Sequence, residues 1–183
     1  MNILLSSAGR RSYIVTYFRE LLNGSGKVFA SNSEWSTALE VADKGVITPL
    51  IYDESYIQFL LELCIKEEIS VIISLFDIDL PVLAKAKANF QEHGINVIVS
   101  DYNVTQICND KWKTYQFLDS AGLNTPRSFI SLKKAEEAVR KKELFFPLIV
   151  KPRWGMGSIS VYTAENMEEL RVFYKKAVRQ LEK

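Results

Sequence analysis

The chain has 183 residues, of which 48% are hydrophobic and 25% charged, and its formal net charge is +1. This is an ordinary globular composition, which excludes disordered and fibrous classes, and no apolar run reaches the roughly 20 residues that a membrane span needs. The N-terminus has no basic segment before its first apolar residues, so it predicts a first strand and not a signal peptide. Cys64 and Cys108 lie far apart without metal-type spacing, which predicts two buried thiols in a reducing, cytoplasmic compartment.

The charge is distributed unevenly along the chain. Residues 1–100 carry 8 Lys and Arg against 12 Asp and Glu, whereas residues 101–183 carry 15 against 10. Solvated helix faces explain much of the basic excess, and an anionic ligand in the second part is the other interpretation. The excess does not require nucleic acid, and we expect neither nucleic acid nor a membrane as a partner.

The first hundred residues alternate between short apolar runs and amphipathic helices. Runs rich in Val, Ile or Leu predict five strands: Asn2–Ser6, Lys27–Ser31, Gly45–Thr48, Val71–Ser74 and Asn96–Val99. Apolar residues at helical spacing predict helices between them: Ser12–Leu22, Tyr56–Ile65 and Leu80–Phe90. Because parallel strands need crossover connections, this alternation predicts an α/β fold, a parallel sheet with helices on both faces.

In such a fold the loops at the carboxyl ends of the strands carry function. Gly9 follows the first strand and opens a helix, as in domains that bind phosphate there. The three-glycine dinucleotide fingerprint is absent, however, and Asn32 stands where an acidic ribose ligand is expected. Arg10 and Arg11 oppose the helix dipole, which indicates either an anion held between them or a solvated pair.

Two carboxylates follow the fourth predicted strand. Asp77 and Asp79 could bind a substrate amine, or a metal together with Asp53 or Glu54. The alternative is that Asp77 or Asp79 caps the next helix, which has a proline in its first turn. The cap is the favoured interpretation.

The pattern changes near residue 100. The elements predicted after it alternate between helix and strand: helix Asn103–Ala121, strand Arg127–Ile130, helix Leu132–Lys142 capped by Ser131, strands Leu148–Val150 and Ile159–Tyr162, and helix Asn166–Glu182 with Leu181 in its apolar stripe. This second part predicts a small α+β unit, too thin to bury both faces of its sheet alone.

The loop between the last two predicted strands is the strongest sign of a binding site. Lys151 ends an apolar strand, where a cation is costly to bury unless it meets an anion. The alternative is a lysine that extends into solvent. Gly155, Gly157 and Ser158 follow, and a turn of this kind allows backbone N–H groups to approach a phosphate closely. The spacing favours a phosphate-binding loop over a hairpin turn of small residues.

Three motifs, in this order and spacing, resemble the ATP-grasp superfamily, above all the large subunit of carbamoyl phosphate synthase and the amino-acid ligases allied to it. They are Asn-Asp-Lys-Trp-Lys at 109–113, Ala-Gly-Leu-Asn-Thr-Pro at 121–126 and Phe-Pro-Leu-Ile-Val-Lys-Pro-Arg at 146–153. The resemblance implies a preATP-grasp Rossmann-like domain over residues 1–100. It implies an incomplete ATP-grasp domain, its N-terminal half, over residues 101–183.

The resemblance also implies an activity, ATP-dependent ligation of small-molecule carboxylate and amine substrates through an acyl phosphate. The implied cofactors are ATP and Mg²⁺. The positions that match the nucleotide-contacting residues of the family are Lys111, Lys151, Arg153, Gly155, Gly157 and Ser158. Arg10, Arg11 and Asp77 are candidate substrate contacts, and no residue is assigned as catalytic. No metal ligand is expected within the chain.

The loop 155–158 is shorter and less glycine-rich than in many ATP-grasp enzymes. The family's adenine-holding strand and its Mg²⁺ ligands are expected beyond residue 183. We therefore expect the N-terminal part of a longer enzyme, inactive alone and weak in ATP binding, with a homodimer or a complementary C-terminal half as its partner. A non-catalytic nucleotide- or metabolite-binding module of the same fold stays open, and so, less favoured, does a Rossmann-type oxidoreductase.

Overall fold

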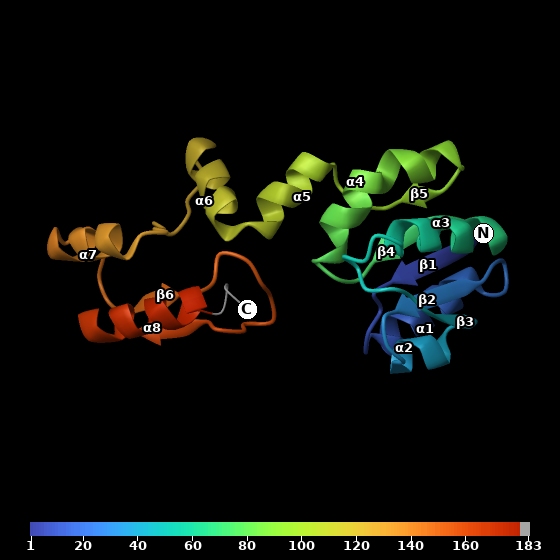
Figure 1. The fold of residues 1–183 in the computed structure, drawn as a ribbon, viewed down its shortest axis with the longest axis horizontal. Coiled ribbons are helices and arrows are strands. Elements are labelled where there is room, and N and C mark those ends of the chain that lie inside the picture. The colour runs from blue at the N-terminus through green and yellow to red at the C-terminus, as the bar shows by residue number, and fades with distance from the viewer. Residues whose placement is uncertain (180–183) are drawn as a thin grey trace. The chain divides into compact units, whose positions relative to one another are not determined.

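The structure is a computed structural model that describes residues 1–179. It divides into two compact units, unit 1 over Met1–Thr105 and unit 2 from Gln106 onward. Figure 1 draws unit 1 in blue to green and unit 2 in yellow to red. No helix in the described residues is long and apolar enough to cross a membrane.

Unit 1 is built on a five-stranded sheet in which every pair of neighbours is parallel. The strands are β1 (Asn2–Ser6), β2 (Val28–Asn32), β3 (Lys44–Ile47), β4 (Ile69–Ser74) and β5 (Asn96–Val97), in the order β3-β2-β1-β4-β5. The order reverses at β1, so β1 and β4 flank the switch point at which open α/β sheets bind ligands beyond the strands' carboxyl ends. The sheet confirms the predicted α/β class.

Helices cover both faces of this sheet (Figure 1). On one face lie α1 (Ser12–Leu22) and α2 (Thr37–Val41), and on the other α3 (Tyr56–Lys66) and α4 (Asp79–Glu92). Because strand side chains alternate between faces, Ile3 and Leu5 of β1 pack toward α1 and α2, while Leu4 packs toward α3 and α4. The sequence pattern predicted all of these helices except the short α2.

Unit 2 is smaller and mostly helical. Its elements are α5 (Tyr102–Asn109), which begins in unit 1, α6 (Lys111–Ser120), α7 (Leu132–Arg140), β6 (Leu148–Val150), β7 (Tyr162–Ala164) and α8 (Met167–Arg179). The strands β6 and β7 pair antiparallel. The core of unit 2 is formed by one side chain from each strand and two from α8: Val150, Ala164, Leu170 and Ala177. Ser131 caps α7, as predicted, and accepts a hydrogen bond from the backbone N–H of Lys134.

Several predictions for the second part are wrong. The single helix Asn103–Ala121 is two helices, because Asp110 adopts extended backbone at φ −112° and ψ 106°. The segment Arg127–Ile130 is not a strand, and the second strand beside the glycine loop begins at Tyr162, since Ile159 lies in a turn. Leu181 and the predicted end of the last helix at Glu182 lie outside the described residues.

The two thiols also differ from the prediction. Cys64 is buried in unit 1, and burial raises the pKa of its thiol to about 12. Cys108 is exposed, so the prediction of two buried thiols is wrong for this residue. It lies near the end of α5, which has only Thr105 fully buried.

Candidate functional site

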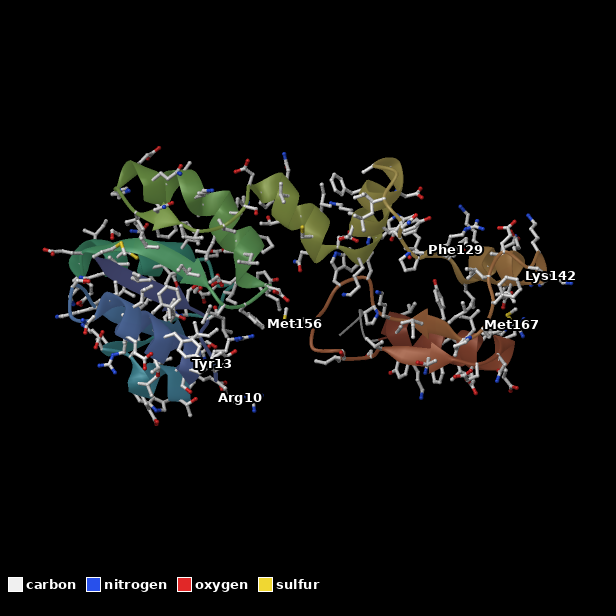
Figure 2. The ribbon with its side chains drawn as sticks, turned by 180° about the vertical axis from the view of Figure 1, so that it is seen from behind. Arg10, Tyr13, Phe129, Lys142, Met156 and Met167 are labelled. Atoms are coloured by element: carbon white, nitrogen blue, oxygen red, sulfur yellow. The ribbon has the colours of Figure 1, made fainter. Side chains whose placement is uncertain are left out.

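The segment between β6 and β7 is the predicted phosphate loop. Its backbone has positive φ at Gly155 (111°), Gly157 (64°), Ser158 (58°) and Ser160 (59°). Positive φ is unfavourable for residues with a Cβ, so the two serines adopt an uncommon conformation. A Cβ at Gly155 or Gly157 would meet no atom within 4 Å, so these glycines are required by backbone conformation and not by close packing. Figure 2 labels Met156 in this loop.

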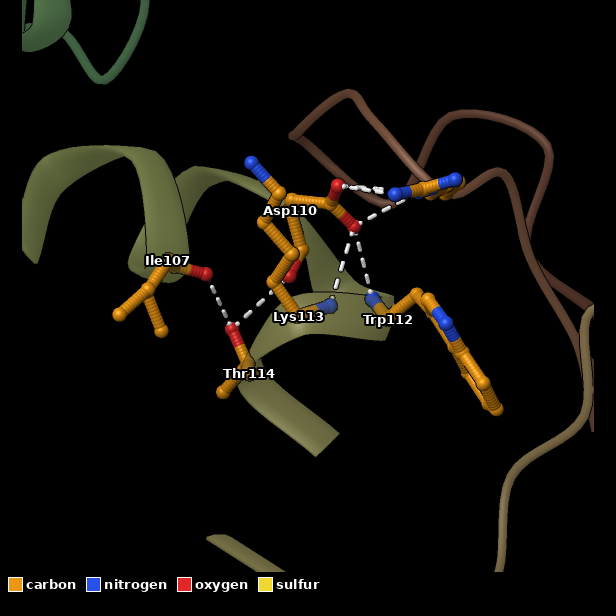
Figure 3. A network of polar contacts seen from close by, with 6 residues as sticks. Ile107, Asp110, Trp112, Lys113 and Thr114 are labelled. Carbon is orange, nitrogen blue, oxygen red and sulfur yellow. Dashed lines mark hydrogen bonds and ion pairs between the residues drawn. The ribbon is translucent and has the colours of Figure 1, made fainter. Parts of the chain in front are cut away.

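A buried carboxylate, that of Asp110, joins this loop to the start of α6. Asp110 is the N-cap of α6 and accepts hydrogen bonds from the backbone N–H groups of Trp112 (3.0 Å) and Lys113 (3.2 Å) (Figure 3). Arg153 of the loop binds the same carboxylate, with Nε at 2.8 and 2.9 Å from its two oxygens and Nη2 at 2.6 Å from Oδ2. The Arg153 hydrogen bonds, helped by the two backbone bonds, hold the pKa of Asp110 below its usual range.

Sequence reasoning quoted Asp110 within a motif and gave it no role. The available signal was local: an aspartate directly before a helical segment is a preferred N-cap. Its second partner, Arg153, lies 43 positions away and could be found only from the fold.

Lys111 makes two further connections to the loop. Its Nζ donates to the carbonyl oxygen of Gly155 at 2.7 Å, and its backbone N–H donates to the carbonyl oxygen of Arg153 at 3.2 Å. Thr114 closes the break between the helices, since its hydroxyl donates to the carbonyl oxygens of Ile107 and Asp110 (Figure 3). The glycine loop is thus fixed to the start of α6 by an ion pair and two hydrogen bonds.

The structure brings together three of the six residues assigned to ATP, namely Lys111, Arg153 and Gly155. Lys151 is exposed, and within residues 1–179 its side chain makes no hydrogen bond or ion pair. Gly157 and Ser158 lie farther along the loop, which turns back through a hydrogen bond from Val161 N–H to Ser158 O. The Arg153 guanidinium also stacks on the half-exposed ring of Trp154, with Cζ 4.5 Å from the ring centroid.

A second polar centre lies at the carboxyl end of β1 and β4 in unit 1. The fully buried Asp79 accepts four hydrogen bonds from hydroxyls: Ser6 (2.7 Å), Ser7 (3.1 Å), Ser74 (2.8 Å) and Tyr56 (2.9 Å). Burial, followed by the nearby charge of Asp79, raises the pKa of Tyr56.

These contacts correct the favoured interpretation, in which Asp77 or Asp79 caps the helix. The N-cap of α4 is Ile78, which makes no side-chain cap bond, and Asp79 is already the first helical residue. Asp79 instead connects two strands and two helices through hydroxyls. Asp77, the candidate substrate contact, is exposed and takes no part in this network.

A pocket of about 160 Å³ lies beside this centre, entirely within unit 1. Residues from the end of β2 and from the segments that follow β1, β2, β3 and β4 line it: Ser7, Gly9, Arg11, Asn32, Ser33, Thr48, Pro49, Ile51 and Phe76. Of the three candidate substrate contacts, only Arg11 lines the pocket. Arg10 is exposed, at the position labelled in Figure 2, and neither Arg10 nor Asp77 is among the lining residues.

The described residues do not supply a metal centre. Within residues 1–179, no group of three or more His, Cys, Asp and Glu side chains is placed to hold a metal ion. Asp53, considered as a metal partner of Asp77 or Asp79, accepts hydrogen bonds from the backbone and hydroxyl of Ser55 instead. The donor set in this part of the chain therefore does not fit Mg²⁺.

Comparison with known families assigns both parts of the chain. Residues 3–98 match the family model described as "PylC-like, N-terminal domain", and residues 108–181 match the model described as "ATP-grasp domain". Among curated proteins, a carbamoyl-phosphate synthase of Methanobrevibacter smithii is 26% identical over 96% of this chain and 46% of its own length. The carbamoyl phosphate synthase large chain, N-terminal section, of Aquifex aeolicus is also 26% identical, over 96% of this chain and 32% of its own.

Solved structures show the same fold. An L-amino acid ligase from Bacillus licheniformis superposes with a TM-score of 0.68 at 22% identity, covering 97% of this chain and 42% of the ligase. The biotin carboxylase domain of the 2-oxoglutarate carboxylase of Hydrogenobacter thermophilus gives a TM-score of 0.67 at 23% identity, covering 96% and 40%. The chain thus spans about half the length, or less, of the relatives that it matches.

Proposed function

The chain belongs to the ATP-grasp superfamily, with a PylC-like N-terminal domain, and on this premise we propose that it is the N-terminal portion of an ATP-dependent carboxylate–amine ligase of the carbamoyl phosphate synthase type. We assign residues 1–100 to the preATP-grasp domain and residues 101–183 to the first half of the ATP-grasp domain. The two family models and the synthase relatives support this proposal.

The single observation that carries it is the attachment of the glycine loop to the start of α6. The Lys111 Nζ lies 2.7 Å from the Gly155 carbonyl oxygen, and the Arg153–Asp110 pair fixes the loop beside it. Two sequence motifs, each weak alone, therefore meet in one place through contacts between residues 43 and 44 positions apart. A cation beside a loop of positive-φ glycines is the arrangement that a polyphosphate requires.

In this proposal the residues of unit 2 position and neutralise phosphates. Lys111 and Lys151 supply positive charge, and the backbone of Gly155, Gly157 and Ser158 supplies N–H donors. Arg153 already uses Nε and Nη2 on Asp110, so its contribution is to hold the loop. When bound, ATP supplies the phosphoryl group that activates a carboxylate for attack by an amine.

The proposal includes Mg²⁺ as the partner of ATP. The biotin carboxylase structure, described as a complex with MgADP, ADP and bicarbonate, supports both by relationship. Because no described cluster of residues 1–179 can hold a metal ion, we derive no step through Mg²⁺ here and place its ligands outside this chain. We further propose a cytoplasmic location with small-molecule substrates, which suits two cysteines that form no disulfide.

The test is acyl phosphate formation by the full-length protein, trapped with hydroxylamine as a hydroxamate over a panel of small carboxylates. We expect ATP-dependent hydroxamate, and we expect Lys151→Ala to abolish it while leaving the thermal midpoint unchanged. Lys133→Ala, an exposed lysine of α7 in the same unit, is the matched control and should keep full activity. Retained activity in Lys151→Ala would refute the assignment of that lysine, and ATP binding without hydroxamate would favour a non-catalytic module.

A further inference from the structure

The pocket in unit 1 has the properties of a site for an anion. Arg11 lines it, and within residues 1–179 the Arg11 side chain makes no ion pair or hydrogen bond. The lining contains no carboxylate. A partly buried guanidinium without a counter-charge favours an anionic ligand, because Arg presents a fixed fork of N–H donors that matches carboxylate or phosphate oxygens.

A second, independent observation is the hydroxyl of Thr48. Thr48 is 8% exposed and lines the pocket, yet its side chain has no hydrogen-bond partner in the described part of the chain. The fully buried side-chain oxygens without a partner in the described residues are those of Ser31 and Ser36, so the Thr48 hydroxyl reaches the pocket surface and is available to an acceptor there. Ser7 cannot serve in its place, because its hydroxyl proton is donated to Asp79.

Gly9 explains how Arg11 reaches this position. Gly9 has φ +55°, and a Cβ placed on it would lie 3.7 Å from Nη1 of Arg11. The guanidinium therefore lies over the glycine turn that follows β1. Arg11 is also the N-cap of α1, where its guanidinium, which has only donors, cannot accept a cap bond from the helix N–H groups.

The other lining residues and the volume of the pocket limit the polarity and the size of the ligand. Pro49, Ile51 and Phe76 are apolar, whereas Asn32 and Ser33 are polar. A volume of about 160 Å³ is smaller than the roughly 300–1,000 Å³ of clefts that enclose drug-sized ligands, so the pocket suits a head group with a few carbon atoms and not a nucleotide. The site lies where the strand order reverses, which is where open α/β sheets bind ligands.

We propose that this pocket binds the carboxylate group of a small organic acid, with Arg11 and Thr48 as its donors and Pro49, Ile51 and Phe76 against its apolar part. Only the further identification of this acid as a substrate or product of the ligation rests on the proposed function. Binding itself is a property of unit 1 and requires neither ATP nor the rest of an ATP-grasp domain.

The experiment is an NMR titration of the ¹⁵N-labelled chain with butyrate, with butyramide as the uncharged match and inorganic phosphate as the competing anion. We expect butyrate to shift the amide signals of Gly9, Ser33 and Thr48 saturably, and butyramide to leave them unchanged. Arg11→Gln should weaken butyrate binding at least 10-fold, and Thr48→Val about threefold. Arg10→Gln is the matched control, because its exposed side chain does not line the pocket, and should bind as wild type does.

Equal losses in Arg10→Gln and Arg11→Gln, or no saturable shift with butyrate, would overturn the site. Shifts with phosphate but not with butyrate would overturn the assignment to a carboxylate. If Arg11→Gln also lowers the melting temperature, weaker binding could come from lost stability. Thr48→Val, which replaces one hydroxyl by a methyl group, then tests the site a second time. Butyrate binding in a full-length protein that forms no hydroxamate would refute the ligase and leave the site standing. Hydroxamate formation unaffected by Arg11→Gln would leave the ligase standing and refute the identification of the bound acid as its substrate.

Discussion

Each unit contains one buried aspartate with several hydrogen-bond donors, and the donors differ in kind. Asp79 in unit 1 is surrounded by four hydroxyls, two from the buried Ser6 and Tyr56 and two from the partly buried Ser7 and Ser74. Asp110 in unit 2 receives two backbone N–H groups and one guanidinium, whose side chain is 30% exposed. Hydroxyls from β1, the loop after it, α3 and β4 make Asp79 a fixed part of the core. The ion pair of Asp110 has one partner, Arg153, at the surface, so water contacts the pair and its strength depends on pH.

This contrast separates a structural centre from one that controls a loop. The Asp79 centre holds the carboxyl ends of β1 and β4 together behind the pocket. The Asp110 centre holds the loop whose Gly155 carbonyl oxygen accepts a hydrogen bond from Lys111 Nζ, the lysine that the proposed function assigns to phosphate. Variants of the two aspartates should therefore fail in different ways.

The largest effect is expected from Asp79→Ala. It leaves the hydroxyls of Ser6, Ser74 and Tyr56 without their acceptor, and we expect a loss of about 3 kcal/mol in the free energy of unfolding. Urea denaturation followed by circular dichroism measures it. Tyr56→Phe removes one donor only and should cost about 1 kcal/mol. Equal costs for the two variants would show that the hydroxyls do not act together on Asp79.

A smaller and more local effect is expected from Asp110→Asn. Asparagine caps a helix as well as aspartate does, but it cannot form the charged pair with Arg153. Hydrogen exchange should accelerate at the amides of residues 154–160 and stay unchanged in α6. Asp110→Ala, which removes cap and pair together, should accelerate both segments. Unchanged loop exchange in Asp110→Asn would show that the ion pair does not hold the loop.

The smallest effect is expected from acid, and it concerns the same pair. Because the folded-state pKa of Asp110 is held below its unfolded value of about 3.9, the ionised carboxylate stabilises the fold fully above that pH. This contribution is lost as pH falls through the lower, folded-state pKa. The difference in unfolding free energy between wild type and Asp110→Asn should thus be constant from pH 5 to 7 and shrink below pH 4. A difference that grows in acid would contradict the ion pair.

Much of unit 1 could be predicted from the sequence. The five apolar runs are spaced by helical patterns, and β1 and α1 have the predicted bounds. Parallel strands buried on both faces are short and strongly apolar, which makes them visible without knowledge of their neighbours. The role of Asp79 could not be predicted, because its four donors come from positions 6, 7, 56 and 74 and meet only in the fold.

Unit 2 was harder to predict for a physical reason. Its sheet has only two short strands in the described residues, and whether a segment joins such a sheet depends more on a neighbouring strand than on the propensity of its own residues. Arg127–Ile130 has residues typical of a strand, but in the described structure it pairs with no neighbour. The helical spacing of apolar residues continues across Asp110, and this hid the break between α5 and α6. Lys111 and the loop were predicted from motifs, but their direct contact at Gly155 required the structure.

The dual role of Asp110 limits how this protein can change. Among the amino acids, asparagine keeps the helix start and loses the charge, while glutamate keeps the charge and is one methylene longer than a cap requires. A substitution at position 110 therefore affects the helix cap, the ion pair or both, and a designer who wants a looser loop should alter position 153, whose side chain takes no part in the cap of α6. Because a single carboxylate both starts α6 and holds the loop, a mutation at position 110 alters the two features together.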